Sequence, residues 1–188
     1  MSTSTIAEPS AVATAVSLRR LYFVRFGFAV VWAALLLAVG KDLGGAAAVL
    51  LVLYPLFDVA AAVVDFRSSR TERPAAGLVV NMALSLLAAV GLGIAASSGI
   101  PAVLRVWGVW AIAAGLVQLV VAIIRYRLGG QWAMILSGGI SVLAGAGFLL
   151  MAGGADAKLT ALAGYATLGG VFFLVSALRL GRVAREGR

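Results

Sequence analysis

Long apolar runs separated by short polar segments dominate the hydropathy pattern of this chain. The runs do not show the apolar–polar alternation of membrane β-strands. Each is about 19–24 residues long, enough for a helix to cross a ~30 Å hydrocarbon core. The pattern therefore predicts an all-α, polytopic membrane protein with six transmembrane helices. The predicted spans are Leu21–Val39, Leu43–Val64, Gly77–Ser97, Pro101–Ile124, Gln131–Ala152 and Lys158–Leu180.

The composition agrees with a lipid environment. Hydrophobic residues make up 63% of the 188 residues and charged residues only 12%, too few to cover a soluble domain of this size. The chain contains no Cys and no His, which excludes thiol chemistry, His-based catalysis, and most zinc and haem sites. The abundance of Ala, Val, Gly and Arg is typical of GC-rich bacterial genomes.

Basic residues are sorted to one side of the six predicted spans. The chain has 15 Lys and Arg against 7 Asp and Glu, and only Lys41, Arg105 and Lys158 fall on the second side. The Lys and Arg bias of loops sets membrane orientation, so the Arg-rich side is expected to be cytoplasmic. We therefore predict a multi-pass protein of the bacterial cytoplasmic (inner) membrane with both termini in the cytoplasm. The arginines on that side are Arg19, Arg20, Arg25, Arg67, Arg70, Arg73, Arg125, Arg127, Arg179, Arg182, Arg185 and Arg188.

The predicted organisation is a disordered cytoplasmic tail over residues 1–18, a transmembrane domain over 19–182 and a basic cytoplasmic tail over 183–188. An alternative treats the first run as a secretion signal, on a weak small-x-small site at Ala38–Gly40 and a twin arginine at Arg19 and Arg20. Because the arginines flank apolar runs, we expect anionic lipid head groups as partners and no nucleic acid.

The helices are predicted to form three repeated hairpins, because the second and third pairs match at a fixed offset. The first pair is more diverged and matches the second through Arg67 and Arg125. A shift of 54 residues superposes Gly91 on Gly145, Gly93 on Gly147, Gly115 on Gly169 and Arg125 on Arg179.

Small residues within the runs are expected to form the contacts between helices, because helices in lipid associate by close packing. The favoured interpretation is packing within one bundle, and the alternative is a face that joins two copies into a homo-oligomer. The predicted packing glycines are Gly27, Gly91, Gly93, Gly115, Gly138, Gly139, Gly145, Gly147 and Gly169.

Two charged residues lie at membrane depth, where charges are costly and often functional. Arg25 lies about one turn into the first span, and Asp58 almost two turns into the second from the same side. The two spans are antiparallel, so we expect Arg25 and Asp58 to form an ion pair. Either the pair is structural, or Asp58 is a proton or ion site. Polar residues near the same level on the other spans are Asn81, Gln118, Ser137 and Ser176.

Most of the large aromatic residues are interpreted as a belt at the membrane interface. No paired carboxylates, nucleophile motif or metal-ligand cluster is present, so we predict no catalytic, cofactor-binding or metal-binding residue and no enzyme. These aromatics are Trp107 and Trp110 close to Arg105, and a group that includes several near-boundary positions, Tyr22, Trp32, Tyr126 and Trp132.

Two Gly- and Ala-rich stretches, Trp107–Leu119 and Trp132–Gly145, carry a resemblance to a known family. Together with the three hairpins, the chain resembles the HdeD-like acid-resistance membrane proteins over roughly residues 19–182. The first hairpin departs most, with Asp58 where the repeat has Leu116 and Gly170. The resemblance implies an inner-membrane protein linked to acid stress at high cell density, and it brings no established catalytic residues.

The leading hypothesis is a non-enzymatic integral membrane protein that supports envelope resistance to stress, acid stress in particular. The alternative is a small transporter or channel, proton-coupled through Asp58.

Overall fold

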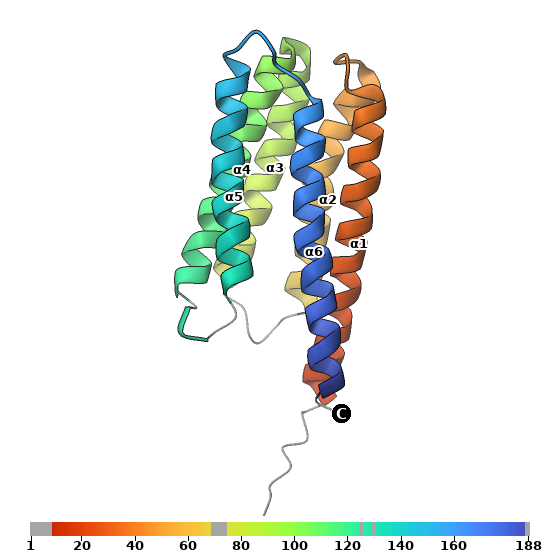
Figure 1. Ribbon diagram of the computed structural model, residues 1–188, viewed down its shortest axis with the longest axis vertical. Helices are drawn as coiled ribbons and strands as arrows, with labels where there is room; N and C mark the ends of the chain where they lie inside the picture. Colours follow the sequence, from red (N-terminus) through yellow and green to blue (C-terminus); the bar gives the residue numbers. More distant parts are fainter. Residues whose placement is uncertain (1–8, 69–74, 125, 129–130, 187–188) are drawn as a thin grey trace, which may run out of the picture.

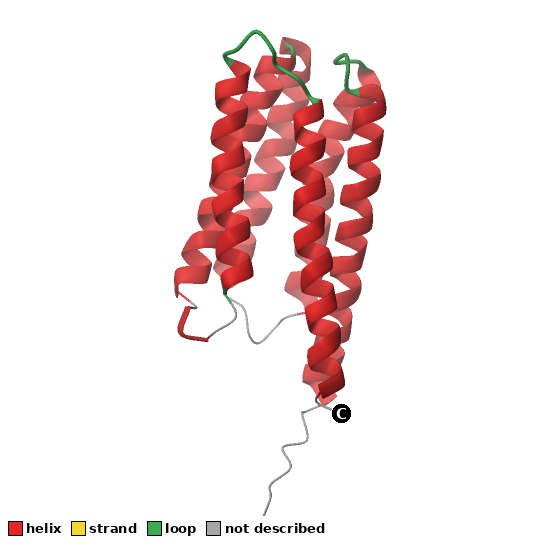
Figure 2. Cartoon of the chain, viewed as in Figure 1, coloured by secondary structure: helices red, strands yellow, loops and turns green. Residues whose placement is uncertain are grey.

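The computed structural model describes residues 9–68, 75–124, 126–128 and 131–186. Within these ranges all regular structure is helical, with no strand (Figure 2). All six long helices are long and apolar enough to cross a membrane, which confirms the six-span fold. The long helices are α1 (Pro9–Val39), α2 (Gly45–Ser68), α3 (Ala75–Ala95), α4 (Ile100–Ile124), α5 (Trp132–Ala152) and α6 (Thr160–Glu186), and the short 3₁₀ helices are η1 (Ala96–Ser98) and η2 (Tyr126–Leu128).

The first and last helices of the chain, α1 and α6, are longer than the apolar runs that predicted them. Residues 9–18 belong to α1, so this part of the predicted disordered tail is helical. Pro9 occupies the first helical position, where its fixed φ suits a helix and its missing N–H would have no partner. No Gly or Pro follows before the first span to stop the helix. At the other end, α6 continues to Glu186, into the predicted basic tail; residues 1–8 and 187–188 lie outside the described residues.

Successive helices run in opposite directions, so α1 begins and α6 ends at the same end of the bundle (Figure 1). We call this the terminal end, and α1 and α6 extend together beyond the other helices there. The opposite end, with the connections over residues 40–44, 96–99 and 153–159, is the loop end. The terminal end is the Arg-rich side of the sequence, but Arg70, Arg73, Arg125 and Arg188 lie outside the described residues.

The helices pack as an open ring in the order α6, α1, α2, α3, α4, α5. The most extensive contacts join α4 to α5 and α1 to α6, whereas α5 and α6 touch at few positions. The third predicted hairpin is thus consecutive in the chain, but each of its helices packs mainly on another partner. The internal repeat itself remains a prediction.

A single hydrophobic cluster fills the loop-end half of the ring, with contributions from all six helices. Its largest fully buried side chains include Trp32, Trp107, Leu36 and Leu51. The buried residues of the terminal-end half, such as Leu21, Ala62 and Ala122, do not belong to this cluster. The candidate site lies where the cluster ends.

Candidate functional site

Asp58 lies on α2 about one turn beyond Pro55. Pro55 is an interior position of this helix, and its side chain is fully buried in the bundle. Proline cannot donate the backbone hydrogen bond that would reach the carbonyl of residue 51. Such a residue is tolerated in a membrane helix because neighbouring helices satisfy and support the local backbone. Trp32 of α1 donates its Nε1–H to the carbonyl of Leu50 at 2.7 Å, which fixes α1 to α2 on the loop-end side of Asp58.

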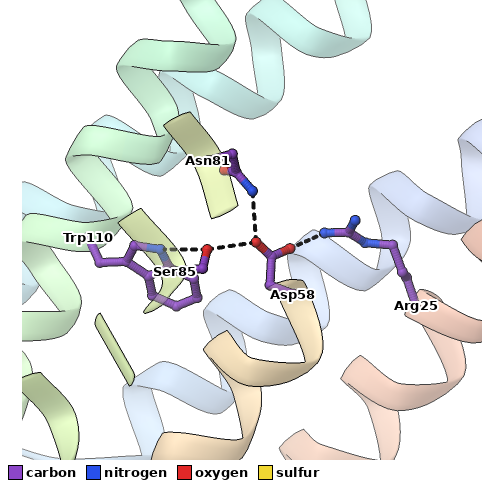
Figure 3. A network of polar contacts seen from close by, with 5 residues as sticks. All are labelled: Arg25, Asp58, Asn81, Ser85 and Trp110. Carbon is purple, nitrogen blue, oxygen red and sulfur yellow. Dashed lines mark hydrogen bonds and ion pairs between the residues drawn. The ribbon is translucent and has the colours of Figure 1, made fainter. Parts of the chain in front are cut away.

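Five side chains form a continuous set of polar contacts around Asp58, which we call the polar network (Figure 3). Nη2 of Arg25 forms an ion pair with Oδ1 of Asp58. On α3, Asn81 Nδ2 and Ser85 Oγ donate to Asp58 Oδ2 at 2.9 and 2.8 Å. Trp110 of α4 then donates its Nε1–H to Ser85 Oγ at 3.3 Å. The polar network therefore links α1, α2, α3 and α4.

A sixth side chain extends this linkage to α6. The guanidinium carbon of Arg25 lies 4.3 Å from the ring centroid of Phe173, within the range of a cation–π contact. Arg25 thus has an ionic partner on α2 and an aromatic partner on α6. The Arg25 and Asp58 side chains are 15% and 14% exposed. Charges that would be costly alone at membrane depth are paired here and almost enclosed.

The structure brings together some of the predicted polar residues and not others. The Arg25–Asp58 pair is confirmed, and Asn81 joins it. Gln118 does not, because that side of α4 packs against α5, where Gln118 lies beside Gly138. Ser176 donates to the carbonyl of Phe172 in its own helix at 2.8 Å.

Sequence reasoning missed Ser85 and Trp110 as members of the polar network. Ser85 follows Asn81 by four residues, so the two share one face of α3, and this spacing was an available signal. Trp110 carried no comparable signal, because its contact with Ser85 depends on how α4 is rotated against α3.

The predicted interfacial belt is wrong for three of the tryptophans. Trp32, Trp107 and Trp110 are buried, with ring centroids of Trp32 and Trp107 5.5 Å apart and those of Trp107 and Trp110 5.3 Å apart. Tyr54 completes the group at 5.4 Å from Trp107. These four rings, which we call the aromatic cluster, lie beside the polar network through Trp110. The rings lie inside the bundle, where they pack favourably against one another.

Two exposed aromatics do occupy the position expected of an interfacial belt. Trp132 and Tyr126 are 69% and 53% exposed at the terminal end, with ring centroids 6.1 Å apart. Their sequence context differs from that of the buried tryptophans, because Tyr126 stands between two arginines and Trp132 follows two glycines and a glutamine.

Three of the predicted packing glycines, Gly115, Gly138 and Gly145, form the α4–α5 contact. A Cβ on Gly115 would lie 2.7 Å from the carbonyl oxygen of Gly138, and one on Gly145 would lie 2.6 Å from that of Gly108. Only glycine permits such close approach of two backbones. Gly108 was not among the predicted packing residues.

The other predicted glycines do not share this role. A Cβ on Gly91 would meet the Val106 side chain at 3.1 Å, and one on Gly93 would make an ordinary contact with Val52 at 3.8 Å. Four positions make no such contact within the bundle, because a Cβ there would have no neighbouring atom of the described residues within 4 Å; glycine content does not reveal which face of a helix meets another helix. These positions are Gly27, Gly139, Gly147 and Gly169.

No known protein family matches the chain, and no curated protein or solved structure shows significant similarity to it. The described residues contain no group of three or more His, Cys, Asp or Glu side chains that could hold a metal ion. The six-span fold and the polar network are therefore the structural features that bear on function.

Proposed function

We propose that this integral membrane protein has a non-enzymatic role in the bacterial cytoplasmic membrane, where it supports resistance of the cell envelope to stress, acid stress in particular. Two observations support the proposal. One is the resemblance of the Trp107–Leu119 and Trp132–Gly145 stretches to the HdeD-like proteins. The other is the saturation of Asp58 in the polar network.

The saturation of Asp58 carries the argument. Both carboxylate oxygens are engaged, one by the Arg25 guanidinium and one by an amide and a hydroxyl donor. A proton or ion site must exchange its ligand, and exchange here would break contacts that join α1, α2 and α3. If Asp58 instead holds the helices together, its contacts with Arg25, Asn81 and Ser85 must persist. The geometry therefore favours a structural role for Asp58.

The absence of histidine from the sequence fits a membrane bundle that works in acid. Histidine is the side chain whose ordinary pKa makes its charge change between pH 5 and 8. Without it, mild acidification changes few charges in this chain. Within the described membrane-spanning helices, Asp58 is tied to Arg25.

The proposal is tested by complementation of a deletion strain of the source bacterium in an acid-survival assay. Asp58→Leu alone strands Arg25 and is expected to lower the amount of folded protein and survival together. The double variant Arg25→Met/Asp58→Leu is expected to restore both. If the deletion strain survives acid as well as its parent strain does, the stress role is overturned. A double variant that is folded and abundant but does not restore survival would overturn the structural role of the pair.

A second candidate function is a small transporter or channel coupled through Asp58. One observation favours it: α5 and α6 touch at few positions, so the ring is least closed at this seam, and Arg25 contacts Phe173 on α6. Proteoliposomes loaded with a pH-sensitive dye test this candidate. Proton flux that is present with the natural chain and absent with Asp58→Asn would support transport over the structural role.

We also propose that the terminal end faces the cytoplasm and meets anionic head groups through its arginines. Arg127 at the terminal end and Asp42 at the loop end are both exposed, and the chain has no cysteine of its own. Single Arg127→Cys and Asp42→Cys variants in intact cells should differ, with only Asp42→Cys labelled by an impermeant thiol reagent. Labelling of Arg127→Cys alone would reverse the orientation.

A further inference from the structure

A groove of about 350 Å³ opens on the outer face of the ring between α3 and α4. Leu84, Leu87 and Ala88 line it from α3, and Val106, Val109 and Ala113 are among the residues that line it from α4. Leu87 and Val109 are 70% and 59% exposed, so the groove is open to the surrounding lipid. Its lining is almost entirely apolar, which suits a hydrocarbon chain.

The groove has one charged residue, Arg105, on the loop-end side of its lining. Arg105 lies about one and a half turns from the start of α4 and is exposed. No carboxylate among the described residues pairs with it. Its position at the loop end is also unusual, because that side of the sequence is poor in basic residues.

We propose that this groove binds one anionic phospholipid from the leaflet at the loop end of the bundle. The phosphate pairs with the Arg105 guanidinium, and one acyl chain lies along Leu87, Val109 and Ala113. This inference concerns a different face from the polar network, so it does not depend on the proposed function.

Charge and shape together select this occupant. A guanidinium forms two parallel hydrogen bonds to phosphate oxygens. An anionic head group then gives a neutral pair, whereas the cationic group of a zwitterionic lipid adds a positive charge beside Arg105 that nothing in the pair offsets. Long basic side chains near the end of a span reach towards the head-group level, where the phosphate lies. The small side chains of Ala88 and Ala113 leave the space between the helices that the acyl chain fills.

The groove also borders the polar network through a shared side chain. Trp110 is one of the residues that line the groove, and its Nε1–H donates to Ser85 Oγ. A bound acyl chain would therefore pack against the residue that joins α4 to the polar network.

Native mass spectrometry of the full chain in detergent tests the proposal with phosphatidylglycerol and phosphatidylcholine of identical acyl chains. The natural chain should retain one phosphatidylglycerol in preference to phosphatidylcholine. Arg105→Gln should weaken phosphatidylglycerol binding about fivefold and remove the preference. Lys158→Gln is the control, because it removes an exposed positive charge from the same end of the bundle. It should leave the preference unchanged.

A second pair of variants tests the acyl-chain part. Ala113→Phe fills the groove and should weaken binding of both lipids, whereas Ala34→Phe, at an exposed position on α1, should not. Arg105→Lys keeps the charge and should retain part of the preference. The proposal is overturned if the natural chain shows no head-group preference, if Arg105→Gln binds as the natural chain does, or if Ala113→Phe has no effect. Loss with Ala113→Phe but no dependence on head group would leave an acyl-chain site only and would also overturn it.

Discussion

In the loop-end half of the bundle, the rings of Trp32, Tyr54 and Trp107 lie in mutual contact inside a cluster to which all six helices contribute. In the terminal-end half, individual contacts join neighbouring helices: the ion pair of Arg25 with Asp58, and the close backbone approach of Gly115 and Gly138. Lipid removes the hydrophobic force between helices, so both halves depend on packing and polar contacts. The loop-end half has a shared core in addition to specific contacts such as Trp32 with Leu50, whereas the terminal-end half relies on specific contacts.

This difference predicts different responses to substitution in the two halves. Removing a large ring from the loop-end half opens a cavity that many neighbours share. Removing one partner of a specific contact in the terminal-end half leaves the other partner without its interaction. A second substitution, at that partner, can then restore stability. The four predictions below use thermal or denaturant unfolding of the purified chain in detergent.

The largest effect is expected at the centre of the aromatic cluster. Trp107 is fully buried, and Trp107→Ala should destabilise the bundle by about 3–5 kcal/mol through cavity formation. Trp132→Ala removes the same side chain at a position that is 69% exposed and should have little effect. Equal losses for the two variants would mean that the loop-end cluster is not the main source of stability.

The ion pair is expected to give the next largest effect. Arg25→Met or Asp58→Leu alone leaves one unpaired charge at membrane depth, at a cost of about 2.5–3.5 kcal/mol. The double variant should recover much of this loss, although Asn81 then lacks its acceptor. A double-mutant cycle measures the coupling. Additive losses from the two single variants would contradict the pairing.

The α4–α5 glycines should be sensitive to a single methyl group. Gly145→Ala would place its Cβ against the Gly108 carbonyl and should cost about 1–3 kcal/mol through overpacking. Gly147 lies on the same helix with no neighbour within 4 Å. Gly147→Ala should therefore be neutral or slightly stabilising, because alanine favours helix. A loss at Gly147 would instead point to a contact outside this chain.

The smallest expected difference separates two tryptophans in direct contact. Trp32 Nε1 donates to the Leu50 carbonyl, whereas the buried Nε1 of Trp107 has no hydrogen-bond partner among the residues that the structure describes. Trp32→Phe should cost about 1 kcal/mol more than Trp107→Phe, because only the first loses a hydrogen bond. The two phenylalanine variants serve as controls for each other, and equal unfolding midpoints would contradict the assignment.

Sequence alone predicted the parts of this structure that depend on depth in the membrane. The six spans follow from run length, and the Arg25–Asp58 pair follows from two charges at one level on antiparallel neighbours. Asn81 was predicted for the same reason. The spacing between Asn81 and Ser85 also contained the information that Ser85 would join them.

The parts that depend on the rotation of a helix about its axis were not predictable from sequence. Trp107 and Trp132 both lie within about the first two turns of a predicted span, yet one is in the core and the other is exposed. Gly145 and Gly147 were both predicted to pack, and only Gly145 meets another backbone. Gln118 was expected in the polar layer and instead lies beside α5.

The sequence by itself determined the number of spans, their order and the level of each polar residue, because transfer from water to lipid depends on composition along the chain. The tertiary structure alone decided which faces meet, that α4 pairs with α5 and α1 with α6, and that Trp110 reaches Ser85. The physical reason is that a membrane helix is apolar on all sides. Leu143 and Leu150 of α5 are 74% and 79% exposed, and in lipid such positions carry no penalty that would distinguish them from the core.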